Sequence, residues 1–579
     1  MNLTKTWTSL ARPFFTRTPK VLVAIALCCC QVHANAEEPS SVLRAMESEL
    51  QRTMSQLRSA SPAPYFVSYS VTEVSSTLIS ASMGALDADV SSTRRILDVD
   101  LRVGSHKLDN TRSIRGVAFE MGRGTRGVEM PLTNDVRALQ SVIWSATDKA
   151  YKSAAERFGK VVTNLQVKVK EEDSSADLSQ ESAHRYIENI EPLRFDTTLW
   201  RDRARTLSGM CAGKKHILTG RVTFQAENLV KYFVNTDGSR IQTSEPIVKM
   251  FVIVKSKADD GMSLPLYESY SAYSTERLPS MKELEADVTR LLDLCTRLRT
   301  APLMETYTGP AILSGRSAGV FFHEIFGHRV EGHRQKDVNS SQTFKPFLNK
   351  KILPEFISVV FDPTLKELAG KDIVGAYRYD DEGMPGNRVV AVDSGMFRSF
   401  LTNRAPIENF PTSNGHGRRQ AGLKTVSRQS NLIVQTSRTV PYDTLRSMLR
   451  KECTKQNKEF GLLFEDIQGG FTFTGRTVPN AFNVQPLVVY KIFADGRPDE
   501  LVRGVDLIGT PLTTFNNIVA AADDIGIFNG VCGAESGGVP VSASSPSLLV
   551  STIEVQKKQK SQAKPPLLSD PTVSAGGQP

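Results

Sequence analysis

The chain has 579 residues, of which 40% are hydrophobic and 23% are charged, with a formal net charge of +9. This composition is typical of a globular protein, and it excludes a disordered, collagen-like or multi-pass membrane chain. Residues 1–36 hold four of the 71 basic side chains and none of the 62 acidic ones, so the rest of the chain is nearer to neutral. Because no basic run with interleaved aromatic residues occurs there, nucleic acid is not expected as a partner.

Residues 1–36 show the pattern of a secretory signal peptide. A basic region ends at Lys20, an apolar segment runs from Val21 to Cys30, and Ala34-Asn35-Ala36 forms a small-residue cleavage site. The apolar segment is too short to span a bilayer. We therefore expect an exported, periplasmic protein that begins at Glu37 and has no membrane span after cleavage. The alternative is an uncleaved anchor.

Residues 37–305 are predicted to form an N-terminal domain with helices and a mixed sheet. Apolar residues from Leu43 to Leu57 recur at helical spacing, and a capping box at Ser280 and Glu283 begins another helix. Segments rich in β-branched and aromatic residues predict strands. The predicted elements are a helix at 43–57, strands at 65–71, 77–80 and 96–101, a helix at 134–158 capped by Asn134 or Asp135, strands at 216–235 and 247–256, and a helix at 280–299.

A junction at 301–310 leads into a second domain, residues 306–556. It is predicted to have one helix at 314–334 and then mostly strands, with hairpin turns at Asp393-Ser394-Gly395 and Asp495-Gly496. Residues 557–579 are rich in lysine, proline, serine and glycine and predict a disordered tail. The predicted fold class is α+β, with an N-terminal mixed α/β-sheet domain followed by a mainly antiparallel β domain that begins with the 314–334 helix.

Four cysteines follow the predicted signal, namely Cys211, Cys295, Cys453 and Cys532. So few cysteines in so long a chain do not form a disulfide framework. Cys295 lies on the apolar stripe of the predicted 280–299 helix, and Cys453 lies near the end of a short predicted helix that begins at about Asp443. Both are therefore predicted to be core residues, whereas Cys532 lies between glycines and is considered below.

Three histidines cluster in the segment His323-Glu324-Ile325-Phe326-Gly327-His328-Arg329-Val330-Glu331-Gly332-His333. A glutamate beside a metal-binding histidine is typical of zinc peptidases, in which it activates a water molecule. The spacing differs from H-E-x-x-H, because His328 follows His323 by five positions instead of four. Five residues of a regular α-helix turn by about 500°, which leaves the two rings about 140° apart.

A metal shared by these two histidines therefore requires a distorted helix. A π-bulge or a break after Phe326 would bring the imidazoles together, and Gly327 would allow it. The alternative is a polar turn whose histidines make ordinary hydrogen bonds. A catalytic zinc site has three protein ligands and one open position, so a third ligand would have to come from elsewhere in the chain.

The segment Phe322 to Gly332 resembles the H-E-x-x-x-H-x-x-E-G motif of the TldD/PmbA family, also called modulators of DNA gyrase, and it resembles the TldD side of that family. Other segments between about 306 and 556 are similar to the family in the same order. They are Asp380-Asp381-Glu382-Gly383, Asn414-Gly415-His416-Gly417-Arg418-Arg419, Gly504-Val505-Asp506-Leu507-Ile508-Gly509, Gly530-Val531-Cys532-Gly533, Ser536-Gly537-Gly538-Val539-Pro540-Val541 and Pro546-Ser547-Leu548.

The resemblance implies a zinc-dependent peptidase with one Zn²⁺ per chain. His323 and His328 would be the nitrogen ligands and Cys532 the sulfur ligand, while Glu324 would be the general base that activates the zinc-bound water. One thiolate with two imidazoles suits tetrahedral zinc. The glycines that flank Cys532 would let the backbone turn tightly around it.

Five further residues are candidates for supporting roles. Glu331 is expected to orient a ligand imidazole. His333 is either an alternative ligand or a residue beside the site, and its distance from the motif favours the second. Asp380, Asp381 and Arg418 are candidates for lining the cleft, with a solvated loop as the alternative.

The expected function is hydrolysis of peptides or unfolded polypeptide segments, which the family resembled binds by adding them to a sheet edge. The alternative is a non-catalytic, metal-stabilised binding module or partner subunit of a TldD/TldE-like pair, and Glu324 argues against it because a structural site needs no base. A thiol enzyme built on Cys532 would lack a C-x-x-C motif. We expect a homodimer or a heterodimer with a related subunit.

Overall fold

The structure is a computed structural model. It describes residues 40–114, 127–166, 173–337, 339–472, 482–509 and 511–558, together with Gly475 and Pro566. The predicted signal peptide and almost all of the predicted disordered tail lie outside these residues. In the part of the chain that the structure describes, no helix is long and apolar enough to cross a membrane.

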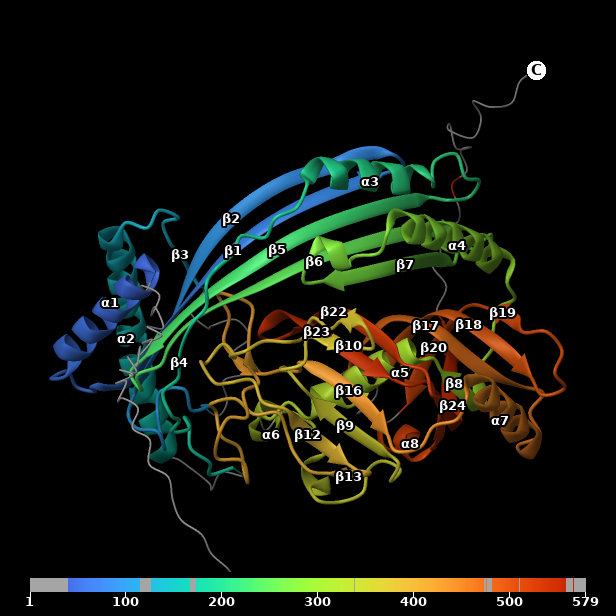
Figure 1. Ribbon diagram of the computed structural model, residues 1–579. Coiled ribbons are helices and arrows are strands. Elements are labelled where there is room, and N and C mark those ends of the chain that lie inside the picture. Colours follow the sequence, from blue (N-terminus) through green and yellow to red (C-terminus); the bar gives the residue numbers. More distant parts are fainter. Residues whose placement is uncertain are drawn as a thin grey trace, which may run out of the picture. The chain divides into compact units, whose positions relative to one another are not determined.

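The first half of the chain folds into one long, curved sheet with helices on its outer side (Figure 1). The strand order is β3-β2-β1-β5-β6-β4, and β7 pairs with the remaining length of β6. All pairs are antiparallel except β4 with β6. The elements are α1 (Ser41–Leu57), β1 (Pro64–Ser82), β2 (Ala85–Val103), β3 (Val128–Glu129), α2 (Val136–Gln166), β4 (Arg185–Ile187), α3 (Thr197–Gly209), β5 (Thr219–Asn235), β6 (Arg240–Lys257), β7 (Ser263–Ala272), the 3₁₀ turn η1 (Thr275–Arg277) and α4 (Met281–Thr300).

Strands β1 and β2 form a longer hairpin than the sequence predicts. The segments predicted as separate strands at 65–71 and 77–80 are one continuous strand. In its polar middle, serine and threonine hydroxyls of β1 contact hydroxyls of β2. Thr77 and Ser91 approach to 2.8 Å, and Ser76 and Ser92 to 3.2 Å. The sequence analysis missed α3 and β7, while the capping box at Ser280 is confirmed.

The two faces of this sheet differ in chemistry. On the outer face, Val67 and Tyr69 of β1 pack beneath α1 and α2, and a second apolar cluster lies beneath α3 and α4. Ser68 and Ser70 of the same strand point to the inner face, where residues of the C-terminal half lie across from them. The inner face is therefore a polar wall that the N-terminal half presents to the C-terminal half.

The second half of the chain contains two mixed sheets, ordered β13-β12-β9-β16-β23-β22 and β17-β8-β24-β20-β18-β19, with β21 beside β24. Most pairs are antiparallel, so the predicted fold class is confirmed, and β16–β23 and β17–β8 are parallel. The elements are β8 (Tyr307–Leu313), α5 (Gly315–Ile325), η2 (Gly327–Arg329), α6 (His333–Lys336), η3 (Lys345–Phe347), β9 (Ile357–Phe361), β10 (Glu367–Leu368), β11 (Lys371–Asp372), β12 (Val389–Asp393), β13 (Met396–Phe397), β14 (Gly417–Arg418), β15 (Val426–Ser427), β16 (Asn431–Thr436), α7 (Tyr442–Lys455), β17 (Phe460–Thr472), β18 (Phe482–Phe493), β19 (Glu500–Val502), β20 (Val505–Gly509), α8 (Pro511–Asn516), β21 (Ile518–Ala521), β22 (Gly526–Ala534), β23 (Gly537–Ser545) and β24 (Leu548–Lys557).

Helix α5 packs against strands of both sheets and is buried at every position except Arg316. Two glycines allow this close packing. A side chain at Gly315 would meet the backbone of Gly526, and one at Gly319 would meet the carbonyl of Ala543. The helix predicted at 314–334 is thus too long, since α5 ends at Ile325 and gives way to the short elements η2 and α6.

Both predicted hairpin turns are present. Ser394 and Gly395 have positive φ between β12 and β13, and Gly496 has positive φ between β18 and β19. Cys295 and Cys453 are fully buried, as predicted, and the four described cysteines are all free thiols.

Candidate metal centre

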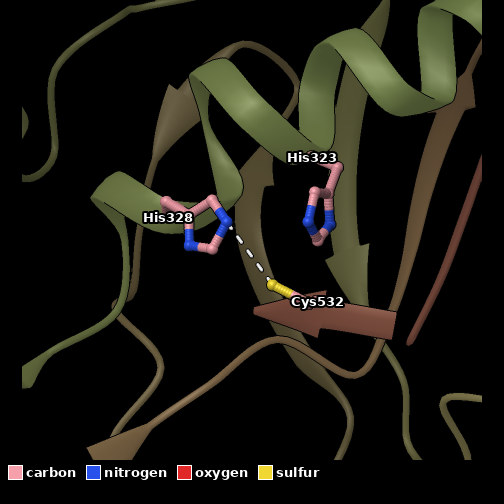
Figure 2. Close-up of side chains that lie close together, drawn as sticks. All are labelled: His323, His328 and Cys532. Carbon is pink, nitrogen blue, oxygen red and sulfur yellow. Dashed lines mark hydrogen bonds between the residues drawn. The ribbon is translucent and has the colours of Figure 1, made fainter. Parts of the chain in front are cut away.

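The structure brings the three predicted ligands together from three elements. His323 comes from the last turn of α5, His328 from η2 and Cys532 from β22. Their candidate ligand atoms all lie within 4.8 Å of one another, and all three side chains are buried. In Figure 2 both imidazoles extend from the helical segment toward the sulfur of the strand below, and the Nε2 atom of His328 lies 3.4 Å from the Cys532 Sγ.

The histidine spacing is accommodated by a break in the helix. Helix α5 ends at Ile325, Phe326 has φ −111°, and a 3₁₀ turn begins at Gly327. The buried Arg329 stabilises the end, because its Nη1 donates to the carbonyls of Glu324 at 3.2 Å and Ile325 at 3.1 Å. The two imidazole rings therefore lie with their centroids 5.1 Å apart, instead of on different sides of a continuous helix.

Gly327 is needed at this break for its size. Its φ is not in the left-handed region. The conformational freedom of glycine, which we expected to be the reason for this residue, is therefore not what the position requires. A side chain here would collide with Gln429, whose Oε1 would lie 1.9 Å from the added carbon. Gln429 in turn donates to the carbonyl of His323 at 3.3 Å and so supports the last turn of α5.

Cys532 lies in a regular strand, which corrects a second expectation. It pairs with Val539 in the antiparallel ladder of β22 and β23, and the flanking Gly530 and Gly533 do not have positive φ. The chain turns at Glu535 and Ser536 instead. The strand holds the sulfur on the buried side, and Cys532 is only 4% exposed.

Charge within the cluster favours a thiolate beside imidazolium. Burial opposes ionisation of Cys532, but the positive charges of His328 and His323 outweigh it and hold the pKa of the thiol well below its ordinary value. Burial likewise lowers the pKa of His328, and the Cys532 thiolate and Glu331 outweigh that effect and raise it well above the ordinary value. The lowered pKa of Cys532 favours the thiolate, which is the form of cysteine that binds a metal.

Glu331 lies beneath His328, as expected, and is fully buried. Its Oε2 is 3.3 Å from the His328 Nδ1 and accepts from the Arg334 Nε at 3.0 Å. Burial raises the pKa of this carboxyl group, but His328 and Arg334 outweigh burial and lower it to about 2. A carboxylate in this position fixes the orientation of the imidazole and leaves Nε2 for the cluster.

Arg428 connects the two halves of the site and was missed by the sequence analysis. This fully buried side chain forms an ion pair with the Glu331 Oε1 at 3.4 Å. Its Nη2 donates to the carbonyl of Cys532 at 2.6 Å, and its Nη1 donates to the Ser536 Oγ at 2.7 Å. Nothing in the polar segment around residue 428 distinguishes this arginine from a surface residue, so no sequence signal could have found it.

Glu324 follows His323 in the last turn of α5 and is 8% exposed. Among the described residues its carboxylate makes no hydrogen bond or ion pair, whereas its backbone carbonyl is held by Arg329. The backbone is thus fixed while the carboxylate remains available as a proton acceptor.

The remaining candidates lie outside the ligand cluster. His333 pairs with Glu535 at the tip of the β22–β23 hairpin, which excludes it as an alternative ligand in this arrangement. Asp380 accepts the backbone N–H groups of Glu382, Met384 and Gly417 and so holds a turn.

Asp381 and Arg418 also make structural contacts. Asp381 forms an ion pair with Lys231 on the inner face of β5 at 3.0 Å and accepts from the Arg419 N–H. Arg418 donates to the carbonyls of Gln429 and Pro540. Asp380 and Arg418 are buried, so the alternative of a solvated loop is wrong for them.

The residues present fit a zinc ion. A thiolate with two imidazoles is a donor set that zinc prefers. Among the described residues the buried Nδ1 of His323 has no hydrogen-bond partner, and a buried polar atom without a partner is uncommon unless a ligand or ion completes it. Glu324 follows His323 directly in the chain, and in hydrolytic zinc sites such a carboxylate accompanies the metal.

Residues 306–557 match the family model described as the PmbA/TldA metallopeptidase C-terminal domain. Residues 306–557 are thus a C-terminal domain of the PmbA/TldD family. The matched region begins with β8 and ends with β24, so it contains all three residues of the candidate metal centre together with Glu324. The expected family is thereby confirmed.

Curated relatives are named as metalloproteases. A metalloprotease of Archaeoglobus fulgidus is 31% identical over 238 residues, which cover 41% of this chain and 51% of the relative. A zinc metalloprotease TldD homolog of Saccharolobus solfataricus is 25% identical over 254 residues, covering 42% and 51%. The chain thus matches about half the length of these relatives, and the matches support a role within a metallopeptidase family.

Solved structures share the fold over more of the chain. A candidate modulator of a DNA gyrase from Thermotoga maritima aligns with a TM-score of 0.59 at 14% identity, covering 88% of this chain and 99% of that one. TldE from Thermococcus kodakarensis aligns with a TM-score of 0.57 at 13% identity, covering 88% and 100%. At this identity the similarity establishes the architecture alone.

Proposed function

We propose that this chain is a zinc-dependent peptidase that hydrolyses peptides or unfolded polypeptide segments. The observation that carries the proposal is the buried cluster of His323, His328 and Cys532, with Glu324 next to His323 in the chain and its carboxylate without a hydrogen bond or ion pair among the described residues. The names of the curated relatives support the same chemistry. A binding module would gain nothing from a free carboxylate at this position.

The roles of the residues follow from their surroundings. Bound zinc would supply a Lewis acid that polarises the scissile carbonyl and makes water easier to deprotonate. Glu324 would accept the proton of the attacking water and transfer it to the leaving amine. Glu331 and Arg428 would keep His328 and Cys532 oriented, since they join the two elements that carry these ligands.

The strand that carries Cys532 offers a place for an extended substrate. Strand β22 is the last strand in the order of its sheet. Val531 lies opposite Pro540, which has no N–H, so the backbone N–H and C=O groups of Val531 point away from β23. Hydrogen-bonded and non-hydrogen-bonded pairs alternate along an antiparallel ladder, so the backbone groups of Gly533 also point away from β23. Val531 is 55% exposed. Among the described residues no strand pairs with this edge of β22, which supports binding of peptide by strand addition, a mode that depends on backbone hydrogen bonds.

The experiment measures hydrolysis of an unfolded peptide by the purified zinc-loaded chain. Each peptide in a set carries a single backbone N-methyl group, and the position of this group differs from one peptide to the next along both sides of the cleaved bond. Cleavage is expected to weaken at alternate positions by about 10-fold for each lost hydrogen bond, because only every second N–H faces a neighbouring strand. Removal of zinc by a chelator is expected to abolish cleavage, and zinc alone to restore it. Absence of cleavage at one zinc per chain would refute the function.

We also propose that the protein is exported to the periplasm and works as a dimer, with a second copy or with a related subunit. The signal pattern of residues 1–36 supports the first part, and the structural similarity to TldE supports the second. Protein purified from its native host is expected to begin at or near Glu37, read by N-terminal sequencing, and to have the mass of two subunits by light scattering. An intact Met1 or the mass of one subunit would contradict the corresponding part.

A further inference from the structure

A second site lies away from the metal centre, where the inner face of the N-terminal sheet meets the C-terminal half. A cavity of ≈ 540 Å³ is lined by strands β1 and β2, by helix α2 and by the loop that includes residues 419, 423, 424 and 425. The loop is fixed to the sheet, since Asp98 forms an ion pair with Arg419 and accepts the Gly422 N–H. The volume is in the range of small-molecule sites and far above that of one ion.

The carboxylates on the described wall of this cavity already have partners. Asp98, Asp100, Glu156 and Asp381 each form an ion pair, and Glu382 accepts the N–H of Arg404. The ion pairs are Asp98–Arg419, Asp100–Arg102, Glu156–Lys160 and Asp381–Lys231. Among the described residues, a further cation of this wall forms no ion pair with any of these carboxylates.

Lys424 is that further cation. It lines the cavity and is exposed to it, and among the described residues it has no hydrogen bond and no ion pair. Partial desolvation of this exposed side chain by the cavity wall, together with the positive charges of Arg102 and Arg157, lowers the pKa of Lys424, while Asp100 and Asp109 oppose the shift. An anion in the cavity would remove this repulsion.

The wall of the cavity also has an apolar part, formed by Phe66, Leu178, Phe233 and Leu423. An inorganic anion would leave this surface and most of the volume unused. An organic carboxylate would use both, with its charge at Lys424 and its apolar part against the rings.

The same loop contacts the hairpin that carries Cys532. The Gln420 N–H donates to the carbonyl of Ser536 at 2.8 Å, and the Gly538 N–H donates to the Gln420 Oε1 at 3.1 Å. Leu423 reaches Gly537 from the cavity side. The loop that carries Lys424 thus packs on the turn of the hairpin that carries Cys532.

We propose that this cavity binds the C-terminal carboxylate of a peptide, with Lys424 as the residue that recognises the charge. The proposal rests on the proposed function, because it assigns the ligand class of peptides that this chain hydrolyses. It names Lys424 as a specificity residue for peptides with a free C-terminus.

The test measures peptide binding by calorimetry in the Glu324→Gln protein, so that the peptide is not consumed. Two probes are compared: one unfolded peptide with a free C-terminal carboxylate and the same peptide as its C-terminal amide. The free acid is expected to bind about 10-fold more tightly, the value of one charge-assisted hydrogen bond. In Lys424→Met the two probes are expected to bind alike, and Lys424→Arg is expected to restore part of the difference.

Lys160→Met is the matched control. Lys160 lines the same cavity but is paired with Glu156, so its loss is expected to leave the preference for the free acid intact. Thermal unfolding midpoints confirm that each variant is folded. Equal binding of acid and amide by the parent, or a preference that persists in Lys424→Met, would overturn the proposal.

An amidated peptide with an internal aspartate serves as a third probe. Binding as tight as that of the free acid would show that the site reads carboxylates in general, and would overturn the assignment to the C-terminus. Failure here differs from failure of the proposed function, because the preference is read by binding alone. A chain that cleaves peptide without a preference refutes the site, and one with the preference but no cleavage refutes the peptidase.

Discussion

Glu324→Gln is expected to lower peptide hydrolysis on the order of 10²-fold or more while zinc content stays at one ion per chain. The substitution keeps the size and hydrogen-bonding capacity of the side chain but removes the base, and loss of a positioned general base has an effect of this size. The fold should not change, because the Glu324 carboxylate has no hydrogen bond to lose among the described residues. Peptide cleavage rates and metal analysis on the same preparations give the result.

Peptide affinity separates this effect from a loss of binding. The backbone contacts at the edge of β22 do not involve the Glu324 carboxylate, so the Kd of an extended peptide is expected to change little. Cleavage by Glu324→Gln at the parental rate, with matched zinc content, would place the base elsewhere. Equal peptide affinity with no turnover in either protein would favour the non-catalytic binding module.

Cys532→Ser is expected to weaken zinc binding by more than about 100-fold. Changing a residue that merely orients a ligand already costs about 10- to 100-fold in metal affinity, and this change removes a thiolate ligand itself. Titration against a competing chelator measures the affinity. The protein should remain folded, because its core is built by both halves of the chain and does not depend on one ion.

Cys453→Ser provides the matched control. Cys453 is also a free, fully buried thiol, but it lies in the apolar cluster beneath α7. The same chemical change there is expected to reduce the free energy of unfolding slightly and to leave zinc affinity unchanged. Full zinc affinity in Cys532→Ser would remove this residue from the ligand set.

Local signals in the sequence predicted the elements with strong patterns. The capping box at Ser280, the positive-φ turns and the apolar stripe of α4 all depend on neighbouring residues, and the structure has each of them. The histidine spacing indicated that a shared metal would require either a π-bulge or a helix break, because a regular helix cannot bring the two rings together, and the structure has the break. The continuous β1 was not predicted, since its polar middle is stabilised by hydroxyl contacts with the neighbouring strand.

The supporting residues of the site could not be predicted because they depend on long-range contacts. Arg428 and Gln429 look like surface residues in the sequence, and their roles arise only when β16 pairs with β23 beneath α5. The reason for Gly327 likewise lies in a side chain about a hundred positions away. Cys532 was identified through the family resemblance, and its regular strand geometry differs from the tight turn that the flanking glycines indicated.

The two sides of the metal centre are 204 residues apart in sequence at His328 and Cys532. During synthesis both histidines therefore leave the ribosome long before the thiol does. The entropic cost of closing such a loop grows only logarithmically with its length, so completion of the centre depends on the docking of the β22–β23 hairpin onto β16. A nascent chain that stops before Gly526 would have His323 of α5 and His328 of η2 but no thiolate. Full coordination therefore requires that the sheet of β9, β16 and β23 has formed.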